Sequence, residues 1–268
     1  MNNNNFDTLF GNIKVKTPVI IAEKLLYSDE NNYNGVKNNI ETVFNSFISA
    51  WEENNKQAFR NIIHSDFKTY GGATKKSYTN IKTSLMDIYP EKDIRNINTK
   101  YFIKDKNYAV IDTDQFYCAA NLSTYTNKKY YFLEEKGSLK LISEEVQSKS
   151  IYNLPFMKNE VDKFVNDWIN AWQSQNINKY MSFYDKNFKT GKENYNIWKT
   201  KKESLFAKNM PVSVKASNIK WNYSKGVYTI EFVQEYTSGD IKDKGVKILE
   251  LSGCPSSFKI KSEKWRKI

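Results

Sequence analysis

The chain of 268 residues has one histidine and two cysteines. These are too few for the ligand sets of zinc motifs or for a framework of disulfides. Ten glycines and five prolines exclude collagen-like and linker-dominated sequences. No apolar run approaches the ~18 residues of a membrane-spanning helix, and residues 1–16 show no signal peptide. Aromatic residues are abundant at 15%, which indicates a packed core and argues against disorder.

Positive charge is in excess, with 41 Lys and Arg against 30 Asp and Glu. The excess is uneven, because residues 158–268 carry a net charge of +9 and residues 1–157 a net charge of +2. Such a field attracts anionic partners, although a lysine-rich composition with solvated side chains is the simpler interpretation. No helix-turn-helix, ribonucleoprotein-type or zinc-finger pattern accompanies the lysines, so nucleic acid is not an expected partner.

The strongest signal is an internal repeat. Apolar residues recur at the spacing i, i+3, i+4, i+7, i+8 and i+11 in two segments 121 residues apart, and this spacing forms one face of a helix. The first set is Ile40, Val43, Phe44, Phe47, Ile48 and Trp51, and the second is Val161, Phe164, Val165, Trp168, Ile169 and Trp172. Both stripes are expected in the core, where large aromatic rings are usually found.

Each copy continues with further helical segments and then with the period-two alternation of β-strands. The third helical stripe of the first copy is expected at Tyr78, Ile81, Leu85 and Ile88, and that of the second at Tyr195, Trp198, Leu205 and Phe206. The strand segments correspond as 108–117 with 227–236, 130–134 with 246–250, and 139–144 with 258–263. Three helices followed by an antiparallel sheet of about four strands form an α+β unit. A curved sheet around the long first helix would leave a conical cavity.

The aromatic residues of the second copy follow the order Phe164-x3-Trp168-x3-Trp172, Tyr180-x3-Tyr184, Phe188 and Tyr195-x2-Trp198. This order resembles the nuclear transport factor two-like, or SnoaL-like, cone fold. More narrowly, residues 36–148 and 157–268 resemble the C-terminal domains of bacterial murein L,D-transpeptidases and cell-shape L,D-carboxypeptidases. The resemblance implies α+β architecture in two tandem cone-shaped domains, each with three helices packed on a curved antiparallel sheet.

Residues 1–35 resemble the end of an L,D-transpeptidase catalytic domain, with a turn at Thr17-Pro18 before a short apolar strand. The Ser-His-Gly-Cys motif that carries the nucleophile in that family is absent, because neither Cys118 nor Cys254 has those neighbours. We therefore expect the chain to begin just past the catalytic cysteine of such a protein. No catalytic residue is assigned to the chain.

Two groups of residues are candidates for ligand contacts. Residues expected to line the cavity are Asp112, Asp114, Tyr117, Glu231, Glu235 and Tyr236. In ketosteroid-isomerase-like relatives, a buried carboxylate of this kind abstracts a proton. The alternative is that these acidic residues lie on the solvated outer face of the sheet. An aromatic and basic group on a hairpin is a candidate for contact with a glycan or a partner, and consists of Tyr125, Lys128, Lys129 and Tyr130.

The resemblance implies a role in cell-wall remodelling or cell shape, in the periplasm or cell envelope. The leading hypothesis is a non-catalytic accessory region of an L,D-transpeptidase-type protein that contacts peptidoglycan, its peptides or a cell-wall enzyme. Two alternatives stay open: a small-molecule-binding protein or SnoaL-like enzyme that uses a cavity carboxylate, and a structural module that forms a homodimer. The sequence gives no reason to expect a cofactor, a metal ion or a membrane span.

Overall fold

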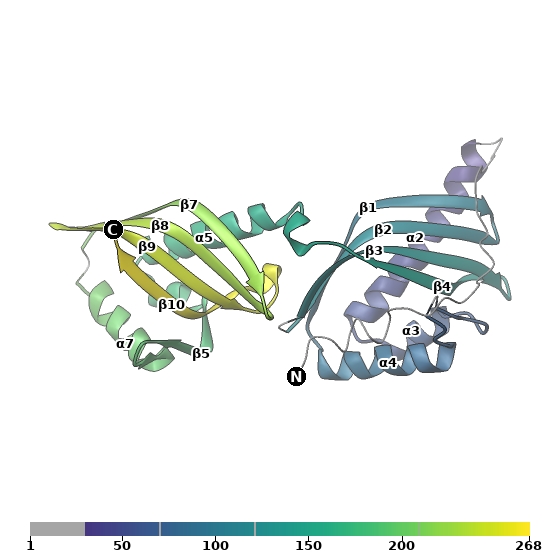
Figure 1. Ribbon diagram of the computed structural model, residues 1–268, viewed down its shortest axis with the longest axis horizontal. Coiled ribbons are helices and arrows are strands. Elements are labelled where there is room, and N and C mark those ends of the chain that lie inside the picture. Colours follow the sequence, from purple (N-terminus) through teal and green to yellow (C-terminus); the bar gives the residue numbers. More distant parts are fainter. Residues whose placement is uncertain (1–29, 70, 121, 209) are drawn as a thin grey trace. The chain divides into compact units, whose positions relative to one another are not determined.

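The computed structural model describes residues 30–69, 71–120, 122–208 and 210–268, and Figure 1 shows its helices and strands. Most of the segment predicted to be a catalytic remnant, residues 1–29 of 1–35, therefore lies outside the described residues. The chain divides into two compact units near residue 150, which we call the first and second domains. None of the helices in the described part is long and apolar enough to cross a membrane.

The described residues of the first domain form three helices followed by a four-stranded sheet with the order β1-β2-β3-β4. The elements are α2 (Glu30–Glu52), α3 (Lys56–Ile62), α4 (Lys75–Ile88), β1 (Lys92–Asp105), β2 (Tyr108–Ala119), β3 (Leu122–Glu135) and β4 (Ser138–Ser148). The long helix α2 runs across one face of the sheet (Figure 1). Asn55 and Thr74 cap the N-termini of α3 and α4 by accepting hydrogen bonds from backbone N–H groups, as short polar side chains at helix starts commonly do.

The second domain repeats this order and adds two short strands. Its elements are η1 (Ile151–Asn153), α5 (Met157–Gln173), α6 (Ile177–Met181), β5 (Tyr184–Thr190), β6 (Glu193–Asn194), α7 (Tyr195–Phe206), β7 (Val212–Ser224), β8 (Val227–Ser238), β9 (Ile241–Ser252), η2 (Pro255–Ser257) and β10 (Lys259–Lys267). The sheet order is β6-β5-β10-β9-β8-β7, with β5 parallel to β10. The sequence did not predict β5 and β6. At the equivalent place in the first domain, the described residues form isolated bridges, Ile63 with Leu141 and Lys68 with Thr74.

The aromatic stripes of the two long helices form the cores, as predicted. Trp51 is 3% exposed and Trp172 is 8% exposed. In the first domain, the rings of Phe44 and Tyr130 lie 5.3 Å apart. The burial of these stripes against the sheet is the main stabilising contribution expected for such an amphipathic helix.

Both sheets carry irregularities at equivalent positions. The pairing of β4 with β3 skips Ile142, and the pairing of β10 with β9 skips Lys261, 119 residues later. Asn98 in β1 and Asn218 in β7 both have a φ of +55°. Bulges of this kind bend a strand and increase its twist, so they account for the curvature of each sheet around its helix.

The strand registers correct one part of the predicted repeat. Tyr130 pairs with Glu144, and Leu249 pairs with Glu263, so the offset of 119 residues also holds for the third strand. The sequence pairing of residues 130–134 with 246–250 was therefore wrong by three residues. The Leu-Glu dipeptide that both segments contain is not at equivalent positions in the two sheets. With the corrected register, Lys128 is equivalent to Lys247.

The third helices bury only some of the apolar residues that mark them in the sequence. Ile88 is 63% exposed and Leu205 is 47% exposed. The residues that α4 buries include Tyr78, Lys82 and Met86, which follow one another at intervals of four. A lysine therefore occupies the centre of the buried stripe.

Candidate functional site

Three ionisable side chains are buried at equivalent positions in both domains. We call Lys82, Lys128 and Glu144 the first cluster, and Lys202, Lys247 and Glu263 the second cluster. In each domain one lysine lies on the third helix, the other on the third strand of the helix-then-sheet repeat and the glutamate on the last strand. All six residues are between 4% and 7% exposed. Lysine and glutamate are rarely so buried unless they are paired, so these two clusters stand out from the rest of the core.

In the second cluster, Glu263 is fully engaged. Lys247 Nζ lies 2.9 Å from its Oε1 atom, and the Tyr184 hydroxyl donates a hydrogen bond of 3.0 Å to Oε2. Tyr184 comes from β5, a strand without a counterpart among the described residues of the first domain, and it also accepts a hydrogen bond from Trp168 Nε1. The carboxylate is thus held by one ion pair and one buried hydroxyl.

Lys202 has no such partner. Its Nζ atom lies 4.2 Å from the ring centroid of Trp172 and 4.6 Å from that of Trp198, and no hydrogen-bond acceptor for it is found among the described residues. Burial lowers the pKa of Lys202 to about 8, partly opposed by the attraction of Glu263. Aromatic faces stabilise a desolvated ammonium by about 2 kcal/mol, less than the several kcal/mol that its desolvation costs. The group would be stabilised by an anion.

In the first cluster, both lysines are buried without a hydrogen-bond acceptor among the described residues. Lys82 Nζ lies 3.8 Å from the ring centroid of Trp51, and Lys128 Nζ lies 5.1 Å from it. Burial, reinforced by Lys128, lowers the pKa of Lys82 to about 7. Burial would raise the pKa of Glu144, but Lys128, Lys82 and a hydrogen bond from Tyr78 together hold it below its ordinary value. The Tyr78 hydroxyl donates to Glu144 Oε2 at 2.9 Å.

A cavity of about 700 Å³ adjoins the second cluster. Its lining includes all three cluster residues together with Trp172, Trp198 and Gln234. The Gln234 Oε1 atom is buried and has no hydrogen-bond partner among the described residues. Leu205 and Trp265 lie at the same cavity and are 47% and 38% exposed. The exposed part of the lining thus mixes these apolar side chains with charged ones, among them Lys192 and Lys201.

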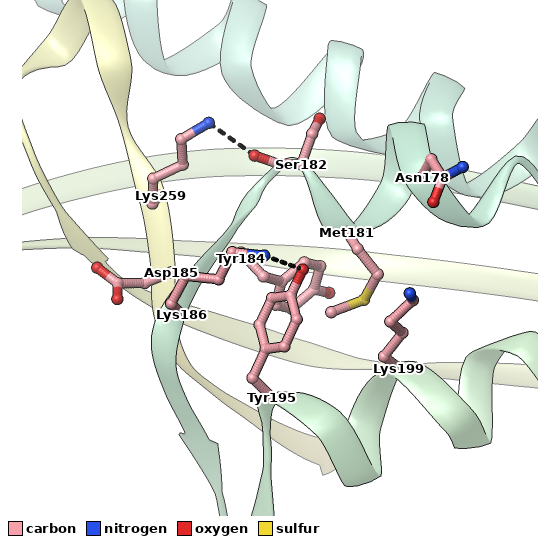
Figure 2. A pocket seen from close by; sticks show the side chains of 9 residues that line it. All are labelled: Asn178, Met181, Ser182, Tyr184, Asp185, Lys186, Tyr195, Lys199 and Lys259. Atoms are coloured by element: carbon pink, nitrogen blue, oxygen red, sulfur yellow. Dashed lines mark hydrogen bonds between the residues drawn. The ribbon is translucent and has the colours of Figure 1, made fainter.

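Figure 2 shows another cavity of the second domain, of about 580 Å³. Two lysines at this cavity already donate hydrogen bonds to groups of the same domain. Lys186 donates to the Tyr195 hydroxyl at 3.0 Å, and Lys259 donates to the Ser182 carbonyl at 2.6 Å (Figure 2). Lys199 lies 3.5 Å from the Glu203 carboxylate. With these three lysines already in contact with other groups, this cavity is a weaker candidate for binding an anion than the cavity at the second cluster.

The structure places the acidic residues proposed for the cavity on the other face of the strands. Successive side chains of a strand point to opposite faces. Gln115 donates a hydrogen bond to the hydroxyl of the core residue Tyr130 and so lies on the face that meets the helix. Asp112 and Asp114 lie on the opposite face and accept hydrogen bonds from Asn127. In β8, Gln234 is buried and its neighbours Glu231 and Glu235 are exposed.

The two tyrosines proposed with them do face the helices. Tyr117 stacks on Trp51 with ring centroids 5.3 Å apart, and Tyr236 lies 5.5 Å from Trp172 and lines the cavity of the second cluster. Tyr117 and Tyr236 therefore lie on the face of the strands that meets the helices, whereas the four acidic residues lie on the opposite face.

The aromatic and basic hairpin is not a surface patch. Tyr125, Lys128 and Tyr130 are 6%, 7% and 0% exposed, and of the four residues only Lys129 is exposed. The alternation of the strand turns Lys128 and Tyr130 into the core and Lys129 out to solvent. Lys128 instead belongs to the first cluster.

The sequence interpretation missed Lys82, Lys202, Lys247 and the two glutamates as site residues. Two signals were present. Lys82 stands between Tyr78 and Met86, and Lys202 between Trp198 and Phe206, each at intervals of four. Glu144 and Glu263 share the same place in the repeat. A charged residue at the centre of an apolar stripe in both copies would have indicated the clusters.

The sequence profile of the Cds6 C-terminal NTF2-like domain matches residues 39–145 and 160–264. The two matches confirm two tandem domains of the cone-shaped α+β type. No curated protein matches the sequence at a significant level.

Several solved structures are similar to parts of the chain. Bd1075 of Bdellovibrio bacteriovorus is 27% identical over 51% of this chain and 51% of that chain, with a TM-score of 0.41. The helical cell shape determining protein Pgp2 of Campylobacter jejuni is 22% identical over 46% of this chain and 46% of its own, with a TM-score of 0.36. A putative scytalone dehydratase of Novosphingobium aromaticivorans is 11% identical over 45% of this chain and 88% of its own, with a TM-score of 0.41. The match with this chain thus covers about half the length of Bd1075 and of Pgp2.

Proposed function

The chain belongs to the family of Cds6 C-terminal NTF2-like domains, and from this premise we propose that it is a non-catalytic binding region that takes up carboxylate groups of peptidoglycan peptides. The observation that carries the proposal is the Lys202 ammonium, which is buried at the floor of a cavity of about 700 Å³ and has no acceptor among the described residues. The cell-envelope setting is taken from the resemblance to L,D-transpeptidase and carboxypeptidase domains.

The charge of the second cluster fits a ligand with one negative charge. Lys247 is neutralised by Glu263 at 2.9 Å, which leaves the charge of Lys202 uncompensated. A carboxylate about 4 Å from this ammonium would gain roughly 4 kcal/mol at the effective dielectric constant of a protein site. Peptidoglycan stem peptides carry free carboxylates, and their amide N–H groups would serve the unpartnered Gln234 Oε1 atom.

The net charge of the second half of the chain supports the same ligand class. Residues 158–268 carry +9, and a field of this sign raises the local concentration of anionic polymers. Long-range attraction of this kind is screened by salt over about 10 Å at 0.1 M.

An enzyme that uses a cavity carboxylate as a base is less well supported. Glu263 is held by Lys247 and Tyr184, and its counterpart Glu144 has a lowered pKa. A general base acts best with a pKa near the working pH. We therefore assign binding, not proton abstraction, to the cavity.

The proposal predicts that Lys202→Met weakens the binding of the whole chain to purified sacculi. A hydrogen bond to a charged group contributes about 1.5–3 kcal/mol, so we expect a loss of about ten-fold or more in affinity in a co-sedimentation assay. Lys208→Met, which removes the same charge from an exposed position just after α7, is the matched control and should bind as the unchanged chain does. Added salt should weaken the binding of both the unchanged chain and the control.

Equal binding by Lys202→Met and Lys208→Met would show that the cavity of the second cluster does not take the ligand. Absence of binding by the unchanged chain at low salt would remove peptidoglycan as the partner.

A further inference from the structure

The charges of the first cluster are less closely paired than those of the second. Lys247 and Glu263 form an ion pair, whereas among the described side chains the Glu144 carboxylate has a hydrogen bond from Tyr78 and no ion pair within 4.0 Å. Both Lys82 and Lys128 are 7% exposed. Two buried ammonium groups therefore face one carboxylate without direct contact to it.

Neither lysine of the first cluster has a hydrogen-bond acceptor among the described residues. Their Nζ atoms instead lie near aromatic rings. Lys82 lies 3.8 Å from Trp51 and 5.5 Å from Tyr78, and Lys128 lies 5.6 Å from Tyr130. An ammonium can donate three hydrogen bonds, so both groups have unused donors in a place that water scarcely reaches.

Two further polar atoms of the same surroundings are buried without a partner among the described residues, Trp51 Nε1 and Gln115 Oε1. Gln115 uses its Nε2 atom on Asn96 and Tyr130, so its carbonyl oxygen is free to accept. Buried polar atoms normally have partners. An indole N–H that lacks an acceptor and an amide oxygen that lacks a donor together match a ligand that offers both.

The second domain shows the same arrangement beside an open cavity. Gln234 is equivalent to Gln115 and Trp172 to Trp51, at offsets of 119 and 121 residues, and both line the cavity of about 700 Å³. The unpartnered lysine on the third helix, the tryptophan and the amide oxygen are thus present twice in one chain.

We propose that the first cluster is a second carboxylate-binding site, so that one chain binds two peptide carboxyl termini. The carboxylate would lie between Lys82 and Lys128 and accept from them, and the neighbouring amide N–H of the peptide would donate to Gln115 Oε1. The ligand class rests on the proposed function, but the site itself rests on the first cluster alone. Two sites on one chain increase the avidity for a polymer that carries many such termini.

The test is an NMR titration of the whole chain that follows the indole N–H signals of Trp51 and Trp172, assigned with Trp→Phe variants. The probe is N-acetyl-alanyl-alanine with a free carboxylate, and its carboxamide is the uncharged control. We expect both indole signals to shift with the carboxylate, and neither to shift with the carboxamide.

Variants then separate the two sites. Lys82→Met and Lys128→Met should each weaken the Trp51 response about ten-fold or more, the scale of a lost hydrogen bond to a charged group, and leave the Trp172 response unchanged. Lys76→Met, an exposed change on the same helix, should affect neither response. The Trp172 signal also reports whether each variant of the first domain leaves the second domain folded.

The outcomes are distinct. A shift of Trp172 alone overturns the second site and leaves the proposed function standing. A shift of Trp51 alone supports the site in the first domain and contradicts the proposed role of the cavity. Absence of both shifts overturns both proposals.

Discussion

At the scale of one residue, Lys82 is a charged group that the folded chain buries at a cost in stability. Its ammonium is held against the Trp51 ring at 3.8 Å, with Lys128 as a like-charged neighbour and Glu144 as the opposing charge. Burial lowers its pKa to about 7, from an ordinary value of 10.5. Such a group stabilises the fold less at neutral pH than an apolar residue of the same length would, which is consistent with a role in binding.

This lowered pKa predicts a pH dependence of stability. Between pH 7 and 10.5 the unfolded chain holds a proton on Lys82 that the folded chain has released, so the free energy of unfolding should rise with pH across this window. Lys82→Met should raise the free energy of unfolding at pH 6.5, by about 1–4 kcal/mol, the range for replacing a buried ionic group by an apolar one, and should make its rise towards pH 9.5 shallower. The measurement is urea unfolding at several pH values, with Lys76→Met as the control. Parallel curves for the unchanged chain and Lys82→Met would contradict the burial of this charge.

The residue scale is also where sequence reasoning was least complete. Hydrophobic periodicity identified Trp51 and Trp172 because large apolar residues at helical spacing have one favourable place, the core. It overlooked Lys82 because a lysine is normally assigned to the solvated face, and no rule of periodicity says when a charged residue replaces an apolar one in the stripe. For the acidic residues of β2 and β8 the sequence left both faces of the sheet open, because alternation fixes two faces but does not say which one meets the helix.

At the scale of elements, the two long helices and the main strands followed from the sequence, because their patterns are long and strongly periodic. The bulges at Ile142 and Lys261 and the short strand β5 did not. A bulge is a single unpaired residue, and no particular residue type marks its position in the sequence. The strand β5 forms by pairing with β10, which lies far away along the chain. The curvature of the sheets and the hydrogen bond from Tyr184 to Glu263 therefore depend on how strands pair in the folded chain.

The close packing of β9 on β10 gives a prediction at this scale. A Cβ atom at Gly245 would lie 2.5 Å from the Arg266 carbonyl oxygen and 2.7 Å from the Trp265 ring. Gly245→Ala should therefore lower the free energy of unfolding by about 1–3 kcal/mol, because the strand backbone must move. Gly35→Ala on α2 is the contrasting variant, because no atom lies within 4 Å of its added Cβ.

In a helix the exchange of glycine for alanine stabilises by about 0.5–1 kcal/mol. Chemical unfolding of both variants should thus give opposite signs. The packing described for β9 and β10 would be wrong if Gly245→Ala were as stable as the unchanged chain.

At the scale of the whole molecule, the chain holds one fold twice, and each copy buries the same three ionisable residues. The copies differ in how the glutamate is supported. Tyr78 from α4 donates a hydrogen bond to Glu144 in the first domain, and Tyr184 from β5 donates one to Glu263 in the second. The same hydrogen bond is thus formed from two different elements, which indicates that an oriented glutamate matters to both clusters.

The charge state of Lys202 tests the central claim most directly, namely that a buried ammonium without an acceptor is where a carboxylate binds. We would follow the ε-methylene signal of Lys202 by NMR as a function of pH in the whole chain, with and without N-acetyl-alanyl-alanine. The account predicts a pKa of about 8 in the free protein and a higher pKa with the peptide, because a bound anion favours the charged form. A pKa near the ordinary 10.5 in the free protein, or one that the peptide leaves unchanged, would contradict it.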